Sequence, residues 1–226
     1  MNEQSAMTRV PATATTALPA DAIRVLRNTY ALLAVTVLFS AATASVSVAL
    51  ALPHPGLLLT LGGYFGLLFA IHRTRNSGLG IALVFALTGF MGVTLGPLLS
   101  AVLGMPGGAT TVMNALGLTG FVFLGVSVYV LRTRSNLNWM GTTLFAGVLV
   151  AFLAGLGAWF FAMPALSLAV SALFALLMSA MIAYETSAII HGGERNYVLA
   201  TVTLFVSLFN LFASLLQLLG LAGGDD

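Results

Sequence analysis

The chain has 226 residues, of which 59% are hydrophobic and only 6% are charged. A soluble domain carries about 25% charged residues, because a water-facing surface needs them. The composition therefore excludes a soluble globule and predicts an all-α integral membrane protein whose main solvent is the lipid bilayer. Since there is no cysteine, disulfides and thiolate metal sites are excluded. All the basic residues are arginine, which excludes a retinal Schiff base on lysine, and a net charge of +2 gives no reason to expect a nucleic-acid partner.

The chain begins with a polar leader, residues 1–29, that contains three arginines. An apolar run over 30–52 follows it and ends at a Pro-His-Pro-Gly segment. A signal peptide is the competing interpretation, because Ala42-Thr43-Ala44 resembles a cleavage site. The run is longer than the 7–15 apolar residues of a typical signal peptide, so it favours an uncleaved first membrane helix.

Six further apolar runs follow, and the first of them is the shortest. They cover residues 57–71, 79–103, 109–131, 139–161, 165–190 and 197–221. A helix needs about 20 mostly apolar residues to cross the hydrocarbon core. We therefore predict one domain of seven transmembrane helices over 30–221, followed by a short tail, 222–226.

The arginines predict the orientation of these helices. With seven helices, every arginine falls either in the leader or in the loops after the second, fourth and sixth helices, and the other loops contain none. Because positively charged loops stay on the cytoplasmic side, the N-terminus is expected in the cytoplasm and the C-terminus on the opposite side of the membrane. The arginines concerned are Arg9, Arg24, Arg27, Arg73, Arg75, Arg132, Arg134 and Arg195.

The third predicted helix carries a pattern of small residues. Gly92 and Gly96 form a GxxxG step, and Gly89 extends the same surface. Helices in lipid associate through close backbone contact, which small residues permit. Pro97 is expected to kink the helix, because it removes one backbone hydrogen bond. The pattern therefore predicts a tightly packed helix rather than a ligand site, and Gly62 and Gly66 are expected to repeat the step on the second helix.

Only one ionisable residue lies clearly inside a predicted helix, and it is Glu185. A charged group in the hydrocarbon core costs about 2.5–3.5 kcal/mol or more, so such residues usually mark a function. Glu185 lies within one to two turns of the helix end, where a structural role at the membrane interface is the alternative. The three histidines lie in loops or at helix ends, so no intramembrane haem, zinc or protease site is expected. The sequence thus predicts no enzyme and no cofactor.

Several short motifs resemble one known family. They are NSGLG at 76–80, FALTGFMGVTLGP at 85–97, YET at 184–186, HGGERNY at 191–197, NLF at 210–212 and LL at 215–216. Together they resemble the Bax-inhibitor motif (TMBIM) family, with the greatest similarity to its bacterial YccA type. The resemblance covers nearly the whole chain after residue 20 and implies a seven-helix bundle around a central last helix.

The resemblance implies one of two activities. Some bacterial relatives are pH-sensitive calcium leak channels, gated by two facing aspartates on the sixth and seventh helices. The first aspartate falls on Glu185, but the second falls on Ser207, which removes the shared proton of a carboxylate pair. In a leak, Ser207 and Asn210 would supply oxygen ligands beside Glu185 and would bind calcium only weakly, since calcium favours six to eight oxygens.

The YccA type is instead known as substrate and modulator of the membrane AAA protease FtsH. We expect this second activity, in membrane-protein quality control, with the protease bound through the leader. The calcium leak is the alternative. The oligomeric state is left open by the sequence.

Overall fold

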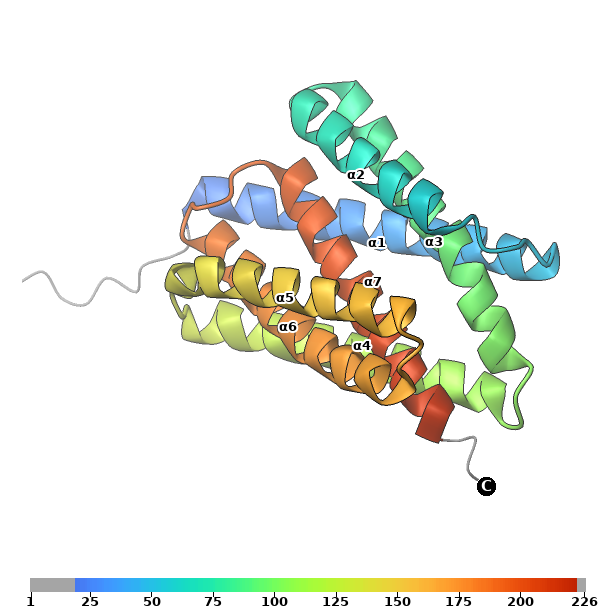
Figure 1. Cartoon of the computed structure of the whole chain (residues 1–226). Coiled ribbons are helices and arrows are strands. Elements are labelled where there is room, and N and C mark those ends of the chain that lie inside the picture. Colours follow the sequence, from blue (N-terminus) through green and yellow to red (C-terminus); the bar gives the residue numbers. More distant parts are fainter. Residues whose placement is uncertain (1–18, 223–226) are drawn as a thin grey trace, which may run out of the picture.

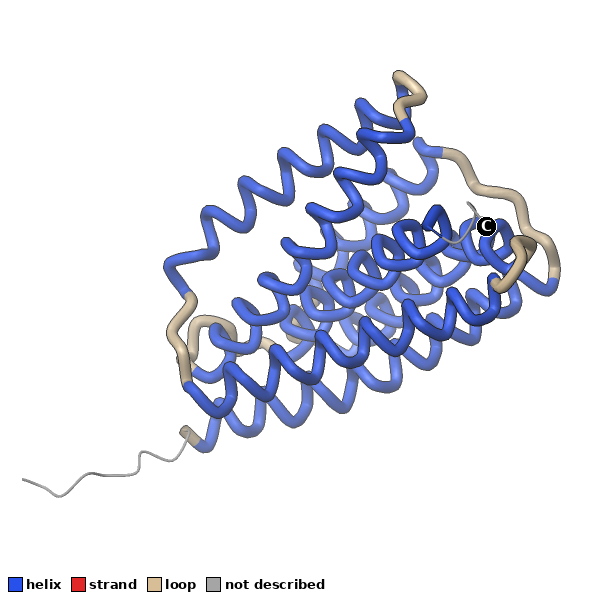
Figure 2. The backbone as a smooth tube through the Cα atoms, turned by 90° about the horizontal axis from the view of Figure 1, so that it is seen from below, coloured by secondary structure: helices blue, strands red, loops and turns tan. Residues whose placement is uncertain are grey.

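The computed structural model describes residues 19–222, which form seven long helices joined by short loops (Figures 1 and 2). No strand occurs in this part of the chain, and all seven helices are long and apolar enough to cross a membrane. The predicted all-α class and helix count are therefore confirmed. The helices are α1 (Ala20–Ala49), α2 (Leu57–Thr74), α3 (Gly78–Leu103), α4 (Gly108–Thr133), α5 (Gly141–Phe160, preceded by the 3-10 turn η1, Asn138–Met140), α6 (Pro164–Ile190) and α7 (Tyr197–Ala222).

The first helix begins earlier than its apolar run. α1 starts at Ala20, inside the predicted leader, whereas the apolar run starts at residue 30. The extra turns carry Asp21, Arg24 and Arg27, which are exposed at the helix start. Hydropathy alone marks the apolar stretch of a helix and misses a polar extension of this kind. The rest of the predicted leader, 1–18, and the last residues of the predicted tail, 223–226, lie outside the described residues.

Successive helices run in alternate directions, so the loops gather at the two ends of the bundle (Figure 2). The start of α1 and the loops α2–α3, α4–α5 and α6–α7 lie at one end, on the left in Figure 1. We call it the arginine end, because it holds every arginine of the described part of the chain. Arg9 lies outside that part.

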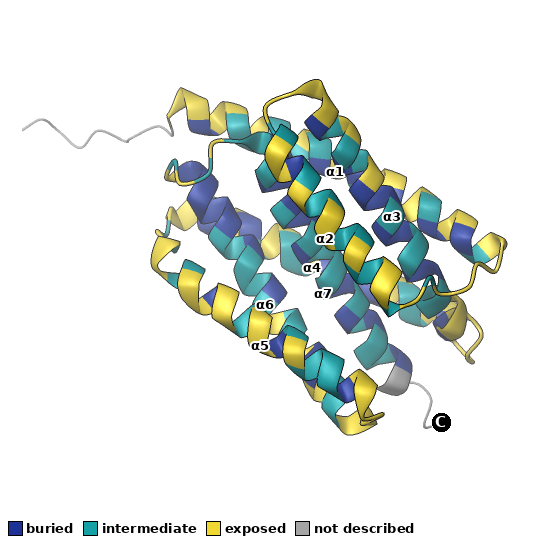
Figure 3. Cartoon of the chain, turned by 45° about the horizontal axis from the view of Figure 1, so that its top comes forward, coloured by how far each residue is buried: buried dark blue, intermediate teal, exposed yellow. Residues whose placement is uncertain are grey.

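The last helix is the centre of the bundle. α1, α2 and α3 lie on one side of α7, and α4, α5 and α6 lie on the other side (Figure 1). α7 contacts α1, α3, α4 and α6, and 56% of its membrane-spanning stretch is buried, against at most 39% in any other helix. Exposed residues lie on the outer faces, most visibly on α2 and α5 (Figure 3). The central last helix that the family resemblance implies is thus confirmed.

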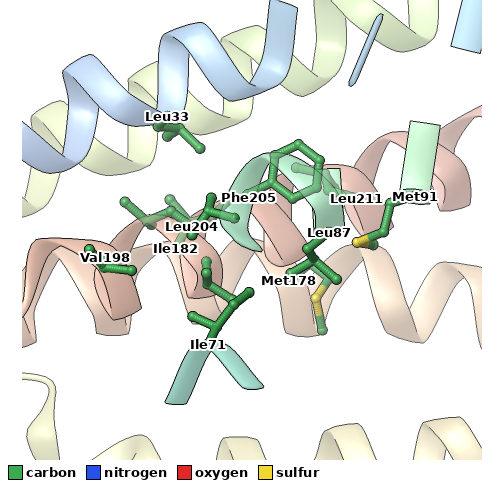
Figure 4. Packing of buried hydrophobic residues seen from close by; sticks show 12 residues of the cluster. Leu33, Ile71, Leu87, Met91, Met178, Ile182, Val198, Leu204, Phe205 and Leu211 are labelled. Atoms are coloured by element: carbon green, nitrogen blue, oxygen red, sulfur yellow. The ribbon is translucent and has the colours of Figure 1, made fainter. Parts of the chain in front are cut away.

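The main apolar core forms where α7 meets the other helices (Figure 4). Leu204, Phe205 and Leu211 of α7 are almost fully buried there. Leu33 of α1 and Ile182 of α6 pack against the same cluster from opposite layers. Apolar packing of this kind does not by itself hold helices together in lipid, where the tails are equally apolar, so close backbone contacts and interhelical hydrogen bonds matter more.

The small residues of α3 provide the closest backbone contact, and their partner is α1. A Cβ atom added to Gly92 would overlap the Ser40 carbonyl and the Thr43 hydroxyl, and one added to Gly96 would overlap Ser47. In the same way, a Cβ atom added to Gly89 would lie 2.8 Å from the Phe39 ring. The three glycines thus lie on the face of α3 that packs against α1.

Pro97 lies within this contact, and α3 continues through it to Leu103. Because proline has no N–H, the carbonyl of Val93, four residues earlier, loses its helical donor. The Ser47 hydroxyl of α1 donates to this carbonyl over 3.0 Å. The hydrogen bond replaces the one that proline removes and joins α1 to α3 at the same point.

The prediction for the second helix was wrong. Cβ atoms on Gly62 and Gly66 would meet nothing within 4 Å, so this step is not a packing surface in the bundle. The glycine of α2 that faces α3 is Gly63, where a Cβ would lie 2.7 Å from the Phe90 ring. The GxxxG spacing alone does not show which face of a peripheral helix is packed.

Candidate functional site

Glu185 lies on α6, five residues before the helix ends at Ile190 near the arginine end. The side chain is 5% exposed, and its Oε1 atom has no hydrogen-bond partner in the structure. No ion pair to Glu185 occurs within residues 19–222. A buried carboxyl oxygen without a partner is costly, so it indicates either an unseen polar partner or a role in function.

Ser207 and Asn210 lie deeper in the bundle, on α7. The Ser207 hydroxyl donates to the Thr203 carbonyl over 2.8 Å, and the Asn210 amide donates to the Val206 carbonyl over 2.8 Å. Both side chains thus bond to their own helix. No hydrogen bond connects either of them to Glu185 in the described chain.

The helix registers explain this separation. Ser207 follows the start of α7 at Tyr197 by ten residues, whereas Glu185 precedes the end of α6 by five. With a rise of 1.5 Å per residue, their depths from the arginine end are about 15 Å and about 7.5 Å. The two positions that the resemblance pairs are therefore offset by about 7.5 Å along the bundle.

Two hydroxyl groups are, like the Glu185 oxygen, buried without a hydrogen-bond partner, and the sequence analysis identified neither of them. They are Thr29 Oγ1 of α1 and Ser127 Oγ of α4, neither of which has a hydrogen-bond partner in the structure. All three groups lie within nine residues of a helix terminus at the arginine end. Nothing in the sequence distinguishes these hydroxyls from the many Ser and Thr side chains that bond to their own helix.

A cavity of about 880 Å³ opens at the same end of the bundle, the arginine end. Its wall includes Asn28, next to Thr29, and Ile189, one helical turn from Glu185. The first turns of α1, the end of α4 and the α6–α7 loop enclose it. Its ionisable lining residues are Asp21, Arg24, Arg134, His191, Glu194 and Arg195.

The α6–α7 loop beside the cavity is fixed by one asparagine. The Asn196 side-chain oxygen accepts from the N–H groups of Val198 and Leu199 and so caps the start of α7. Its amide nitrogen donates to the Asn76 side chain over 2.8 Å and to the Arg75 carbonyl over 3.3 Å. The NSGLG and HGGERNY motifs therefore meet in space, although they are far apart in sequence.

The α4–α5 loop is held to α6 by Ser187. The Ser187 hydroxyl donates to the Ser135 carbonyl over 2.8 Å and accepts from the Leu137 N–H over 2.9 Å. The His191 Nδ1 atom lies 2.9 Å from the Ser187 carbonyl, which places the imidazole against the end of its own helix. His191 lines the cavity, so this contact fixes one part of the cavity wall.

The opposite end of α6 and α7 is joined by a second polar cluster. The Ser171 hydroxyl donates to Gln217 Oε1 over 2.7 Å, and Gln217 Nε2 donates to the Ser167 hydroxyl over 2.8 Å. Each partner satisfies the other, so this cluster has a structural role. The described residues contain no group of three His, Cys, Asp or Glu side chains that could hold a metal ion.

The fold and the site together define a polytopic membrane protein in which the last helix is the most buried and packs against α1, α3, α4 and α6. A family model described as "Inhibitor of apoptosis-promoting Bax1" matches residues 23–224. The chain therefore belongs to this family, the Bax-inhibitor family, as the motifs indicate.

Bacterial relatives match over almost their whole length. The chain is 50% identical over 202 residues to "Modulator of FtsH protease YccA" of Escherichia coli K12, which covers 89% of this chain and 92% of the relative. It is 52% identical over 202 residues to an uncharacterised protein of Pseudomonas aeruginosa, covering 89% and 91% of the two chains. The relative in E. coli O6:H1 is named "Inner membrane protein YccA" and is 50% identical over the same 89% and 92%.

Proposed function

We propose that this protein modulates the membrane protease FtsH in the bacterial inner membrane. The observation that carries the proposal is the 50% identity, over 202 residues, to a relative named as a modulator of that protease. The identity extends through the membrane-spanning helices, so it covers the surfaces on which two membrane proteins would meet. The function is non-enzymatic, in keeping with the words modulator and inhibitor in the names of its relatives.

The test is a reconstituted degradation assay. FtsH and a model membrane substrate are placed in proteoliposomes with and without the full chain, and the substrate is followed by gel densitometry. A change in the substrate half-life that grows with the amount of this protein supports the proposal. An unchanged half-life at a molar excess contradicts it.

We propose the leader as the segment that FtsH engages. α1 starts at Ala20, inside the leader, so deleting residues 2–18 removes no residue of a described helix. Deletion should lengthen the lifetime of the protein in cells that contain FtsH. A chain with the same leader residues in scrambled order is the control for length and composition. An unchanged lifetime after deletion contradicts the proposal that FtsH engages the leader.

We propose that the arginine end faces the cytoplasm, with the C-terminus in the periplasm. The asymmetry of arginine between the two ends supports this orientation. An alkaline phosphatase fused after Asp226 should be active, because that enzyme requires an oxidising compartment, and a fusion in the α6–α7 loop should be inactive. The opposite pattern would reverse the orientation.

The second candidate function is a cation leak, favoured by the unpartnered Glu185 oxygen one turn beneath the polar cavity. Calcium entry into proteoliposomes should then change in Glu185→Gln. Glu194→Gln is the matched control, because its carboxylate lies in the α6–α7 loop at the cavity wall. Entry that never exceeds that of empty liposomes would exclude the leak.

A further inference from the structure

The cavity at the arginine end has the chemistry of an anion site. Its lining carries three arginines, Arg24, Arg134 and Arg195, against two carboxylates, which leaves one net positive charge with His191 neutral. The arginines come from three separate segments: α1, the end of α4 and the α6–α7 loop. They are far apart in sequence, and the fold brings them to the wall of one open cavity.

The acidic residues are partly occupied elsewhere. Glu194 Oε1 accepts from the Asn196 N–H over 2.6 Å, so one carboxylate oxygen is used to shape the loop. Asp21 lies in the first turn of α1, where a negative charge interacts favourably with the helix N-terminus. One oxygen of Glu194 thus has a local partner, and the lining as a whole carries more positive than negative charge.

Two arginines have features that suit binding. Arg195 Nε donates to the Gly192 carbonyl over 3.2 Å, which directs the guanidinium group while its two terminal nitrogens take no part in that bond. Arg134 takes a left-handed backbone conformation, with φ 51° and ψ 36°, at the end of α4. Non-glycine residues are uncommon in this conformation, and the side chain of Arg134 reaches the cavity wall.

The location of the cavity indicates the source of the anion. It lies at the starts of α1 and α7 and at the ends of α4 and α6. In a bundle that spans the membrane, these helix ends are expected at the level of the lipid headgroups. Apolar side chains of Val25, Ile189 and Ile190 form part of its wall. Arginine forks match phosphate oxygens, and basic pockets between membrane helices bind anionic headgroups. A volume of about 880 Å³ is large enough for a phosphate with its glycerol groups.

We propose that this cavity binds the phosphate-bearing headgroup of an acidic phospholipid. The arginines hold the phosphate, and the apolar wall receives the glycerol backbone where the acyl chains begin. The site is distinct from Glu185, which lies a turn deeper, and from any protease contact. It does not depend on which end of the bundle faces the cytoplasm, because both leaflets present headgroups at this level.

The test is native mass spectrometry of the full chain in neutral detergent, with phosphatidylglycerol or phosphatidylcholine added at equal concentration. The wild type should retain phosphatidylglycerol in preference to phosphatidylcholine. Arg24→Gln/Arg134→Gln/Arg195→Gln should lower the apparent affinity for phosphatidylglycerol by about tenfold or more. Equal retention of the two lipids by the wild type would overturn the proposal.

A matched variant distinguishes the effect of the cavity arginines on lipid binding from the effect of the total charge at this end. It removes three arginines from the same end, none of which lines the cavity: Arg73→Gln/Arg75→Gln/Arg132→Gln. It should bind phosphatidylglycerol as the wild type does. An equal loss in both triple variants would overturn the proposal, because the lipid would then respond only to the total charge of the arginine end.

Two further measurements distinguish the remaining outcomes. Inorganic phosphate should raise the melting temperature less than phosphatidylglycerol does; an equal rise from phosphate alone would overturn the assignment to a lipid. If the cavity triple variant does not fold, Arg134→Gly replaces it, since glycine suits the left-handed backbone at this position. Arg134→Gly should fold and bind less phosphatidylglycerol, and wild-type binding by this variant would contradict the role of Arg134.

Discussion

The hydrogen bond from Ser47 to the Val93 carbonyl should contribute measurably to the stability of the bundle. In Ser47→Ala this carbonyl loses its donor, because Pro97 offers no N–H and α3 cannot replace the bond. Interhelical hydrogen bonds in membranes average about 0.6 kcal/mol and reach about 1.7 kcal/mol. Since this carbonyl has no alternative helical donor, we expect a loss of about 1–2 kcal/mol of unfolding free energy.

A double-mutant cycle tests the physical reason for that loss. In Pro97→Ala, the new N–H at position 97 can bond to the Val93 carbonyl, so Ser47→Ala should then cost clearly less than in the wild-type background. Unfolding in mixed micelles, followed by circular dichroism, gives the four free energies. Ser45→Ala is the control, because its hydroxyl is exposed and bonds to Ala41 in its own helix. Equal costs of Ser47→Ala in both backgrounds would refute the compensation of Pro97 by Ser47.

Three other substitutions test the packing and the buried polar groups by the same unfolding measurement. Gly92→Leu should destabilise by about 1–3 kcal/mol or more through overlap with α1, whereas Gly62→Ala, in open space, should be tolerated; equal effects would contradict the assigned α1–α3 contact. Asn196→Ala should cost about 0.5–2 kcal/mol, because α7 loses its cap, and a neutral result would show that the cap is not needed. Glu185→Met should stabilise by about 1–3 kcal/mol if the carboxyl oxygen is unpaired, and a loss of stability would reveal a polar partner.

Helix number, helix limits and the common position of the arginines were predictable, because each depends on signals summed over many residues. An apolar run ends where the chain leaves the lipid, so the predicted run 165–190 and α6 (Pro164–Ile190) almost coincide. The start of α1 was not predictable from hydropathy, since Ala20 lies ten residues before the apolar run. The polar first turns of α1 contribute to the wall of the cavity at the arginine end.

Tertiary partners were not predictable from one sequence. The glycines of α3 indicate a close helix–helix contact, but only the fold shows that α1 is the partner helix. In the same way, Gln217 is an isolated polar residue in the sequence, and its bonds to Ser167 and Ser171 require the register of α7 against α6. The unpaired hydroxyls of Thr29 and Ser127 depend on helix rotation, which no local pattern fixes.

The register of α7 also limits what the family resemblance can transfer. Asn196 joins the NSGLG and HGGERNY motifs, so those motifs have a structural explanation that requires no ion pathway. The same contact fixes where α7 begins, and this start places Ser207 about 7.5 Å deeper than Glu185. A gate built from these two side chains would need α7 to shift by more than one helical turn or a chain of water to span the gap. Glu185 is therefore better treated as a single buried carboxyl group near the cavity than as half of a pair. Any effect of Glu185→Gln on ion entry should be the same whether or not Ser207 is also replaced.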